Sequence, residues 1–231
     1  MEISLRLKTV ADMVHEKRLA DIGTDHGYVP IYLVKEGRIE SALACDINKG
    51  PLEKAESNVK ANCLADKIET RLGSGLVPVE KGEVDCAVIA GMGGMLIIDI
   101  LKASADVVEG LNQLVLQPQL DADEVRKYIH SIGFKIEKEE FLLDAGKYYA
   151  VISAVKGEEK YETNADYVFG RTNIENKNAV LKEFIEKKLI TNGRILENIA
   201  KNGTGGNEEK IEEIEKDNIL CREVLERYEN K

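Results

Sequence analysis

The chain has 231 residues, of which 43% are hydrophobic and 32% are charged, and its formal net charge is −10 at pH 7. This length allows one substantial core with room for an additional element, and the composition is typical of a folded soluble protein. The acidic excess argues against a nucleic-acid partner, which normally requires a basic face. Arg6, Lys8, Lys17 and Arg18 nevertheless cluster near the amino terminus, either as a local basic surface or as a solvated helix face.

The cysteines give no sign of a metal or disulfide site. They lie at positions 45, 63, 86 and 221, without a Cys-x-x-Cys pair and without a histidine at ligand spacing. This pattern predicts reduced structural thiols and no metal. No apolar run is long enough to span a membrane, and residues 1–6 carry no apolar leader. We therefore expect a cytoplasmic protein without a membrane partner.

The hydrophobic pattern predicts an amphipathic helix over residues 4–17, followed by strands that alternate with helices. The expected strands are residues 19–22, 41–46, 67–72, 84–90, 113–117, 134–143 and 147–156. The expected helices between them are residues 29–36, 51–62, 94–103 and 122–132. Five strand–helix units and a terminal strand pair predict an α/β fold with an open, mostly parallel sheet of seven strands.

Two of these helices carry their own start signals. Pro51 suits the first position of a helix, and Asp121 with Glu124 is typical of a capping box. We therefore expect helices to begin directly at these residues.

The character of the chain changes after Gly157. Residues 174–201 and 207–229 are highly charged with helical periodicity, and the segment 202–206, Asn-Gly-Thr-Gly-Gly, separates them. Two apolar stripes run along these helices: Leu181, Phe184, Ile185 and Leu189 on one, and Ile211, Ile214, Cys221, Val224 and Leu225 on the other. We expect an antiparallel helical hairpin, and therefore two domains, residues 1–157 and 158–231.

The loop after the first strand carries the clearest functional signal, Asp21-Ile22-Gly23-Thr24-Asp25-His26-Gly27. Gly23 and Gly27 let the backbone approach a ligand closely, and a helix with Pro30 in its first turn follows. The acidic Asp21 would repel a pyrophosphate, so the pattern differs from the G-x-G-x-x-G of nicotinamide-binding folds. A ligand with an ammonium group fits better, and S-adenosylmethionine (SAM) is such a ligand. An ordinary β–α turn is the alternative.

A second acidic residue ends the next strand. Asp46 lies one β-α-β unit after Asp21, where a carboxylate accepts hydrogen bonds from the ribose hydroxyls of an adenosine ligand. A solvated strand-end aspartate is the alternative.

Three later strand ends complete the expected site, because open α/β sheets bind ligands at the carboxyl ends of their strands. Gly73-Ser74-Gly75 follows the third strand and either contacts adenine or forms a simple turn. Gly91, Gly93 and Gly94 follow the fourth, and so many glycines indicate close approach of a flat ligand or base. Gln117-Pro118-Gln119 ends the fifth, as a turn that presents amide groups to a substrate or merely as a turn.

The missing motifs narrow the acceptor. Methyltransferases that act on exocyclic amines usually carry D/N-P-P-aromatic after the fourth strand, where this chain has Ala90-Gly91-Met92-Gly93-Gly94. Transfer to C5 of a pyrimidine needs a cysteine nucleophile at a strand end, and Cys86 is expected within a strand. A ring nitrogen, whose lone pair needs no covalent activation, remains.

Six blocks of the sequence resemble the bacterial TrmK family, tRNA (adenine-N1) methyltransferases that act at position 22 of tRNA. They are R-L-x-x-V-A-x-x-V at 6–14, ADIGTDHGYVPIYL at 20–33, GSGL at 73–76, AGMGGML at 90–96, LQPQ at 116–119 and GKYYAV at 146–151. The resemblance covers the whole chain, although the hairpin matches in character only. Relatives commonly have Asp at the place of Ser74, Asn at that of Gln119 and Glu at that of Ala150.

The resemblance implies a Rossmann-like class I SAM methyltransferase domain and a helical tail that helps to hold tRNA. The residues that we expect to bind SAM are Asp21, Gly23, Thr24, Gly27, Asp46, Ile47, Gly73, Ser74, Gly75, Ala90, Gly91 and Met92. The residues that we expect at the substrate are Arg6, Gly93, Gly94, Gln117, Pro118 and Gln119.

Methylation at N1 leaves a positive charge on the adenine, which a nearby carboxylate would stabilise. Asp25 is the candidate, with His26 as its partner and Tyr28 as a stacking surface; the alternatives are a turn carboxylate, a capping histidine and a core tyrosine. Because N1 lies on the Watson–Crick edge, the target nucleotide must be unpaired or flipped out.

Other functions remain open. The protein could methylate another RNA or a small molecule with SAM. An NAD-dependent oxidoreductase is disfavoured by Asp21 and by the absence of G-x-G-x-x-G. A nucleotide-binding protein without catalysis, which interacts through its hairpin, is the third alternative.

Overall fold

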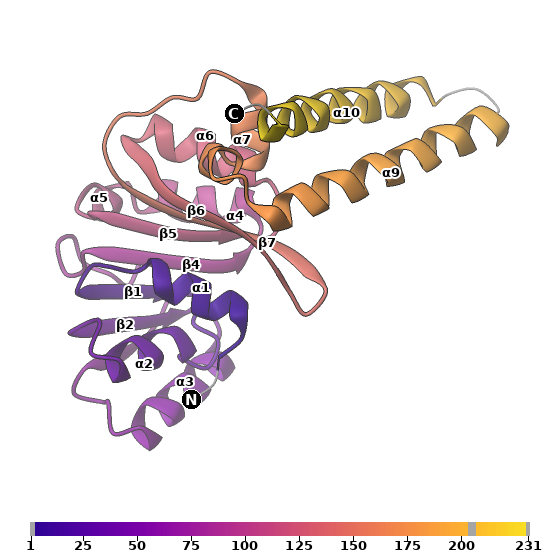
Figure 1. Ribbon diagram of the computed structural model, residues 1–231. Coiled ribbons are helices and arrows are strands. Elements are labelled where there is room, and N and C mark those ends of the chain that lie inside the picture. Colours follow the sequence, from indigo (N-terminus) through magenta and orange to yellow (C-terminus); the bar gives the residue numbers. More distant parts are fainter. Residues whose placement is uncertain (1–2, 203–206, 230–231) are drawn as a thin grey trace. The chain divides into compact units, whose positions relative to one another are not determined.

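The computed structural model describes residues 3–202 and 207–229 (Figure 1). Its contacts divide the chain into two compact units, Met1–Lys160 and Tyr161–Lys231.

Seven strands of the first unit form one sheet in the order β3-β2-β1-β4-β5-β7-β6 (Figure 1). Their bounds are β1 (Arg18–Ile22), β2 (Ser41–Asp46), β3 (Ile68–Leu72), β4 (Cys86–Met92), β5 (Gln113–Pro118), β6 (Phe134–Asp144) and β7 (Lys147–Lys156). Strands β1 to β5 pair in parallel, and β7 runs antiparallel between β5 and β6. The predicted α/β fold with a mostly parallel seven-stranded sheet is confirmed. The strand order reverses between β1 and β4, so the carboxyl ends of these strands border the crevice where such sheets bind ligands.

Helices cover both faces of the sheet, as a parallel sheet requires. Their bounds are α1 (Leu5–Met13), α2 (Tyr28–Lys35), α3 (Lys49–Ala61), α4 (Gly94–Ala103), α5 (Ala105–Glu109) and α6 (Ala122–Ser131). Helix α1 packs against α2 in front of the sheet in Figure 1, and α4 packs against α6 behind it. The middle strands are therefore buried on both sides: β5 is buried along its whole length, and β4 at its first four residues.

The first helix is shorter than the predicted 4–17, because a side chain of the sheet binds its end. Val14 is extended, and the helix stops at Met13. The buried Gln113 donates from Nε2 to the carbonyl of Met13 over 2.7 Å and accepts the N–H of His15 at Oε1 over 3.2 Å. These long-range hydrogen bonds replace the bonds of another helical turn.

Three other local predictions were also wrong in detail. Helix α3 begins at Lys49, so Pro51 is its third residue; the first turn still needs no N–H donor there. Asp121 adopts φ 56° and ψ 38° instead of the extended conformation of a capping residue, and its side chain makes no capping bond. Cys86 is the first residue of β4, at the amino end and away from the ligand-binding edge.

The second unit is helical, with α7 (Asn164–Phe169), α8 (Arg171–Glu175), α9 (Ala179–Asn202) and α10 (Glu208–Glu229). Lys188 Nζ lies 2.7 Å from a carboxylate oxygen of Asp217, and Asn192 Nδ2 donates to Oδ1 of Asn218 over 2.9 Å. Lys177, two residues before α9, donates from Nζ to the carbonyl of Tyr228 near the end of α10, so the start of α9 lies beside the end of α10 and its later residues lie beside earlier ones. The predicted antiparallel hairpin is confirmed, and residues 203–206 of its expected turn lie outside the described residues.

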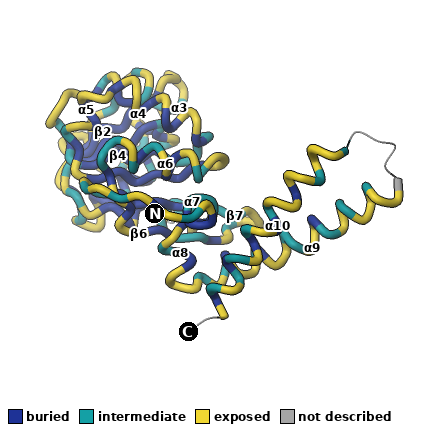
Figure 2. Tube along the Cα trace, turned by 90° about the horizontal axis from the view of Figure 1, so that it is seen from above, coloured by how far each residue is buried: buried dark blue, intermediate teal, exposed yellow. Residues whose placement is uncertain are grey.

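Apolar stripes hold the hairpin together, and buried positions recur along both helices in Figure 2. The buried members of the two stripes are Leu181, Ile185, Ile214, Cys221 and Val224. Within the described ranges, no helix is both long and apolar enough to cross a membrane.

Candidate active site

A cleft of about 460 Å³ opens at the carboxyl ends of β1 to β4. Its lining residues are Arg6, Ile22, Gly23, Asp25, Asp46, Ile47, Asn48, Gly73, Ser74, Gly75, Ala90, Gly91, Met92, Leu96, Ile100 and Gln119. A second chamber of about 280 Å³ is lined by Arg6, Leu7, Asp21, Gly23, Asp25, Tyr28, Val29 and Ala90. The two cavities share Arg6, Gly23, Asp25 and Ala90, and therefore adjoin each other at the end of β1. We call them the large chamber and the small chamber.

The loop after β1 shapes the boundary between the two chambers. Gly23 has φ 72°, and its N–H and that of Thr24 donate to the carbonyl of Cys45 at 2.8 and 3.0 Å. A Cβ atom on Gly23 would lie 2.3 Å from the terminal methyl carbon of Met92, a flexible side chain that can move aside, so it is the left-handed backbone that favours glycine here. This turn brings β1 and β2 together at their ends, which places Asp21 near the small chamber and Asp46 at the large one.

Asp21 is a buried carboxylate with one side-chain partner in the described part of the chain. Its exposed fraction is 7%, and the Thr24 hydroxyl donates to Oδ2 over 2.6 Å. Burial raises the pKa of the Asp21 carboxyl to about 6, and the hydrogen bond from Thr24 offsets part of that rise. A cation in the small chamber would therefore be stabilised by a poorly solvated negative charge.

Asp46 occupies the end of β2 as predicted from its position. It is buried, and Oδ1 accepts the N–H of Asn48 over 2.7 Å. Ile47, between these residues, is 64% exposed and lines the large chamber as an apolar wall. An acidic hydrogen-bond acceptor next to an apolar wall suits the ribose and the base of a nucleoside.

The glycines of the site are required for different reasons. We expected close approach of a ligand to explain them all, and it does not. A Cβ on Gly73 would lie 2.9 Å from Pro78, one on Gly75 would lie 2.8 Å from Ile100, and one on Gly94 would lie 2.6 Å from the carbonyl oxygens of Leu120 and Asp121. Internal packing thus explains these three glycines.

Gly91 and Gly93 differ from the other glycines. Gly91 has φ 81° at a β-bulge between Ala90 and Met92, and Gly93 has open space where a side chain would be. The bulge turns the end of β4 and leaves room beside the chambers.

Arg6 enters both chambers from α1 and is fixed from several sides. Its Nη1 donates to Oε1 of Gln117 over 2.8 Å, and its guanidinium carbon lies 5.5 Å from the centre of the Tyr149 ring. The backbone N–H of Arg6 donates to a carboxylate oxygen of Asp144. Among the described residues, no carboxylate pairs with the guanidinium, so its positive charge is free to meet a ligand.

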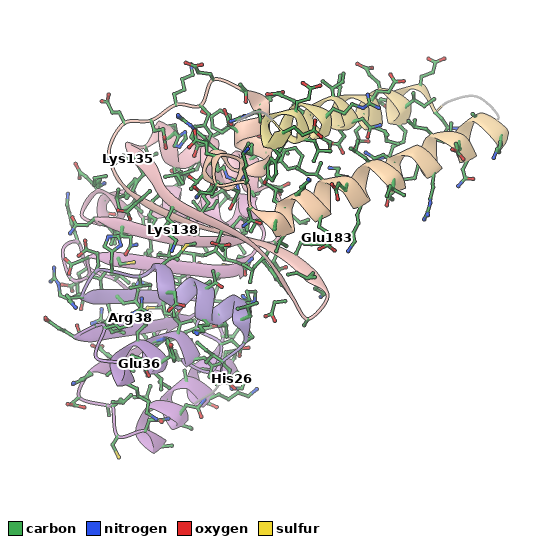
Figure 3. The ribbon with its side chains drawn as sticks, in the orientation of Figure 1. His26, Glu36, Arg38, Lys135, Lys138 and Glu183 are labelled. Carbon is green, nitrogen blue, oxygen red and sulfur yellow. The ribbon has the colours of Figure 1, made fainter. Side chains whose placement is uncertain are left out.

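The other three residues of the expected basic cluster do not join Arg6. Lys17 donates to the carbonyl of Arg38, and Arg18 pairs with Asp85 at the opposite end of the strands. Figure 3 shows Arg38 and His26 near opposite ends of α2. Of the two alternatives left open by the sequence, a basic surface shared with Arg6 therefore does not apply to Lys17 and Arg18, and Lys8 is an exposed residue of α1.

The three candidate catalytic residues lie together in the loop that leads into α2. Asp25 is exposed and lines both chambers, and its Oδ1 lies 3.2 Å from Nε2 of His26. The His26 ring stacks on Tyr28 with centroids 5.1 Å apart and an interplanar angle of 7°. Tyr28 lines the small chamber, whereas His26 lines neither chamber, and the backbone carbonyl of His26 accepts a hydrogen bond from Asn58.

Several expected site residues do not line either chamber and instead hold those that do. They are Thr24, His26, Gly27, Gly93, Gly94, Gln117 and Pro118. Thr24 binds Asp21, the fully buried Gln117 binds Arg6, and Gly27 caps α2 with a left-handed backbone. Pro118 pairs with Met92 beyond the bulge of β4.

The large chamber is also lined by residues that were not predicted, among them Asn48, Leu96 and Ile100. Asn48 could have been found from its place two residues after Asp46, as the residue before α3. Leu96 and Ile100 share one face of α4 at a spacing of four residues, but helical spacing alone does not distinguish a ligand wall from a core stripe.

Comparisons with known proteins show to which proteins the chain is similar. A family model described as a methyltransferase domain matches residues 3–152. A Bacillus subtilis (strain 168) protein named tRNA (adenine(22)-N(1))-methyltransferase is 33% identical over 233 residues, and the match covers 98% of each chain.

Two solved structures extend this similarity. The Streptococcus pneumoniae protein Sp1610 in complex with S-adenosyl-L-methionine has a TM-score of 0.87 and 32% identity, over 97% of this chain and 100% of that one. M. capricolum TrmK in complex with S-adenosyl-homocysteine (SAH) has a TM-score of 0.86 and 29% identity, over 99% and 100%. From sequence and fold together, the chain belongs to the TrmK family of methyltransferases.

Proposed function

We propose that this protein uses SAM to methylate N1 of an adenine in tRNA, at position 22. The observation that carries the proposal is a pair of adjoining chambers, one lined by Asp21 and the other by Asp46, at the ends of neighbouring strands. The chain is also similar along its whole length to a protein named tRNA (adenine(22)-N(1))-methyltransferase. A tRNA substrate would place this activity in the cytoplasm.

The residues of the two chambers fit SAM. The Asp46 carboxylate and the exposed Ile47 would bind the ribose and the adenine, and Gly91 at the bulge lines the same chamber without a side chain of its own. Asp21 would bind the ammonium group, which stabilises the buried carboxylate in its charged form. SAM itself would supply the methyl group, activated by its bond to a sulfonium.

The chain's task in the reaction is positioning and electrostatic stabilisation. N1 of adenine carries a free lone pair at neutral pH, so no base has to remove a proton. The N1–methyl bond would form as the sulfur–methyl bond breaks, which leaves a neutral thioether and a positive charge on the adenine ring, and Asp25 at the junction of the chambers would stabilise that charge. The stacked rings of His26 and Tyr28 would hold Asp25 and one face of the flipped base.

We also propose that residues 158–231 contribute to tRNA binding, although most of their basic side chains are already paired. Arg171, Lys182, Lys187 and Lys188 each lie within ion-pair distance of a carboxylate of the same unit. Arg194 is exposed and has no such partner in the described part of the chain. The contribution would therefore come from a few free cations rather than from a continuous basic stripe.

The direct test is methyl transfer to a tRNA transcript that carries adenine at position 22, followed by mass spectrometry of the digested nucleosides. We expect 1-methyladenosine from this transcript and none from a transcript with guanine at the same position. Equal methylation of both would contradict the site, and no transfer to any tRNA would contradict the substrate class.

A further inference from the structure

The amino-terminal Arg6 is the cation that the two chambers share. It lines both, together with three residues from the ends of β1 and β4. The sequence placed it at the RNA substrate. Its surroundings favour a different partner.

The small chamber carries opposite charges. Asp21 is buried there with a single side-chain partner, Thr24, and the structure gives its Oδ1 no donor among the described residues. Arg6 brings to the same chamber a guanidinium that pairs with no carboxylate of the residues described by the structure. An α-amino acid carries one ammonium and one carboxylate, and it complements these two groups at once.

A phosphate fits this place less well. Asp21 and Asp25 line the small chamber, and Asp46 lines the large one, so an RNA phosphodiester held by Arg6 would bring its negative charge toward three carboxylates without a cation of its own. A single carboxylate attached to an ammonium is repelled less, since the ammonium interacts favourably with Asp21. The local charges thus favour a zwitterion over an RNA backbone.

The support behind Arg6 fixes its fork in advance. Gln117 is fully buried at the end of β5, its Oε1 accepts from Nη1, and its own Nε2 donates to the carbonyl of Pro118. Tyr149 of β7 lies against the guanidinium from another strand. A guanidinium ordered before binding loses little entropy when it pairs with a carboxylate through two parallel hydrogen bonds.

We infer that Arg6 binds the carboxylate of the amino-acid portion of SAM, opposite Asp21, and that Gln117 and Tyr149 position it. This inference rests on the proposed function only in its choice of ligand. By this inference the two parts of the cofactor bind in different chambers: the large chamber binds the nucleoside, and the small chamber binds the amino acid.

The test compares two ligands by titration calorimetry. SAH has the whole amino-acid portion, whereas 5′-methylthioadenosine keeps the nucleoside and the thioether and lacks the amino acid. Arg6→Met should weaken SAH binding by about 10- to 100-fold and leave the binding of 5′-methylthioadenosine within about twofold. Arg6→Lys keeps the charge without the fork and should recover part of the loss. Lys8→Met, on an exposed side of the same helix, is the matched control and should change neither ligand.

Three other results would contradict the assignment of Arg6. Equal weakening of both ligands by Arg6→Met would show that Arg6 supports the nucleoside site or the fold, and would overturn the assignment. Unchanged SAH binding with a raised KM for tRNA would return Arg6 to the substrate. Failure of the unaltered protein to bind either ligand would contradict the proposed function, and this assignment with it.

Discussion

The hydroxyl of Thr24 donates to Oδ2 of Asp21 over 2.6 Å, and it is the only side chain of the described residues that partners this buried carboxylate. One neutral hydrogen bond does not compensate for the loss of water around a charge. The charge on Asp21 is consequently unfavourable in the ligand-free protein and becomes favourable when a cationic ligand binds. Burial raises the pKa of its carboxyl to about 6, close to neutral pH.

Cofactor affinity is expected to depend on pH through Asp21. Below about pH 6 the carboxyl takes up a proton, and an ammonium ligand must then displace it. SAH should bind progressively more weakly as the pH falls from 7 to 5, approaching a tenfold loss per pH unit. Calorimetry across this range would measure the effect. Asp21→Asn should bind SAH weakly at every pH, and a variant that keeps the slope would show that another group titrates.

The same residue should oppose folding of the ligand-free protein. The folded-state pKa of about 6 lies above the ordinary 3.8, so the proton on Asp21 stabilises the folded state at low pH, and that stabilisation is lost as the pH rises through 6. At pH 7.5, Asp21→Asn is expected to raise the free energy of unfolding by about 1–3 kcal/mol. Denaturant unfolding would measure it, with the exposed Asp66→Asn as a control that should have no effect. A destabilised Asp21→Asn protein would contradict the reasoning.

Removing the charge of Asp46 should weaken nucleoside binding irrespective of the amino acid. Asp46→Asn retains an oxygen for the N–H of Asn48 and so preserves the local turn. Both SAH and 5′-methylthioadenosine should bind about 10- to 100-fold more weakly, because the ribose loses a charge-assisted acceptor. A 2′-deoxy analogue, which lacks one of the hydroxyls, should bind the variant and the unaltered protein more equally. Unchanged affinities would remove Asp46 from the ribose site.

Asp25→Asn is expected to act on the chemical step. Its side chain is 77% exposed, so the substitution should leave folding and SAH affinity nearly unchanged. The turnover number should fall by about tenfold, because the amide no longer offsets the charge that forms on the adenine. Single-turnover methylation separates this step from binding. A normal rate would exclude the electrostatic role.

The helical unit is expected to affect tRNA and not the cofactor. Arg194→Ala should raise the KM for tRNA and reduce the salt dependence of binding, because one free cation is lost. Lys187→Ala is the matched control, since Lys187 already pairs with Glu183 on the same helix. SAH affinity should be unchanged in both variants. If the control has the larger effect, the paired residues and not the free ones make the contact.

The sequence predicted the order of strands and helices well, because apolar periodicity is a local property of each segment. It placed Asp21 and Asp46 at neighbouring strand ends, since parallel strands put their carboxyl ends at one edge. It could not show that Gln113 ends the first helix or that Gln117 lies behind Arg6, since each contact joins residues about a hundred positions apart.

The glycines mark the same limit from the other side. Gly73, Gly75 and Gly94 look alike in sequence to Gly91, yet the first three avoid collisions with Pro78, Ile100 and the backbone after β5. A motif can indicate that a side chain is forbidden without showing what forbids it. Only the packed structure distinguishes a neighbour within the fold from space left for a ligand.

The amide pair of Asn192 and Asn218 sets how the long helices can be used. Both side chains are buried, and each is a partner of the other. If α9 slid by one turn along α10, both amides would lose that bond inside an apolar interface, at a cost of about 1–3 kcal/mol for each group. The amide pair therefore fixes the register of α9 against α10. Along the 24 residues of α9, about 36 Å, the exposed charges therefore keep constant distances from those of α10. A binding partner has to match these distances.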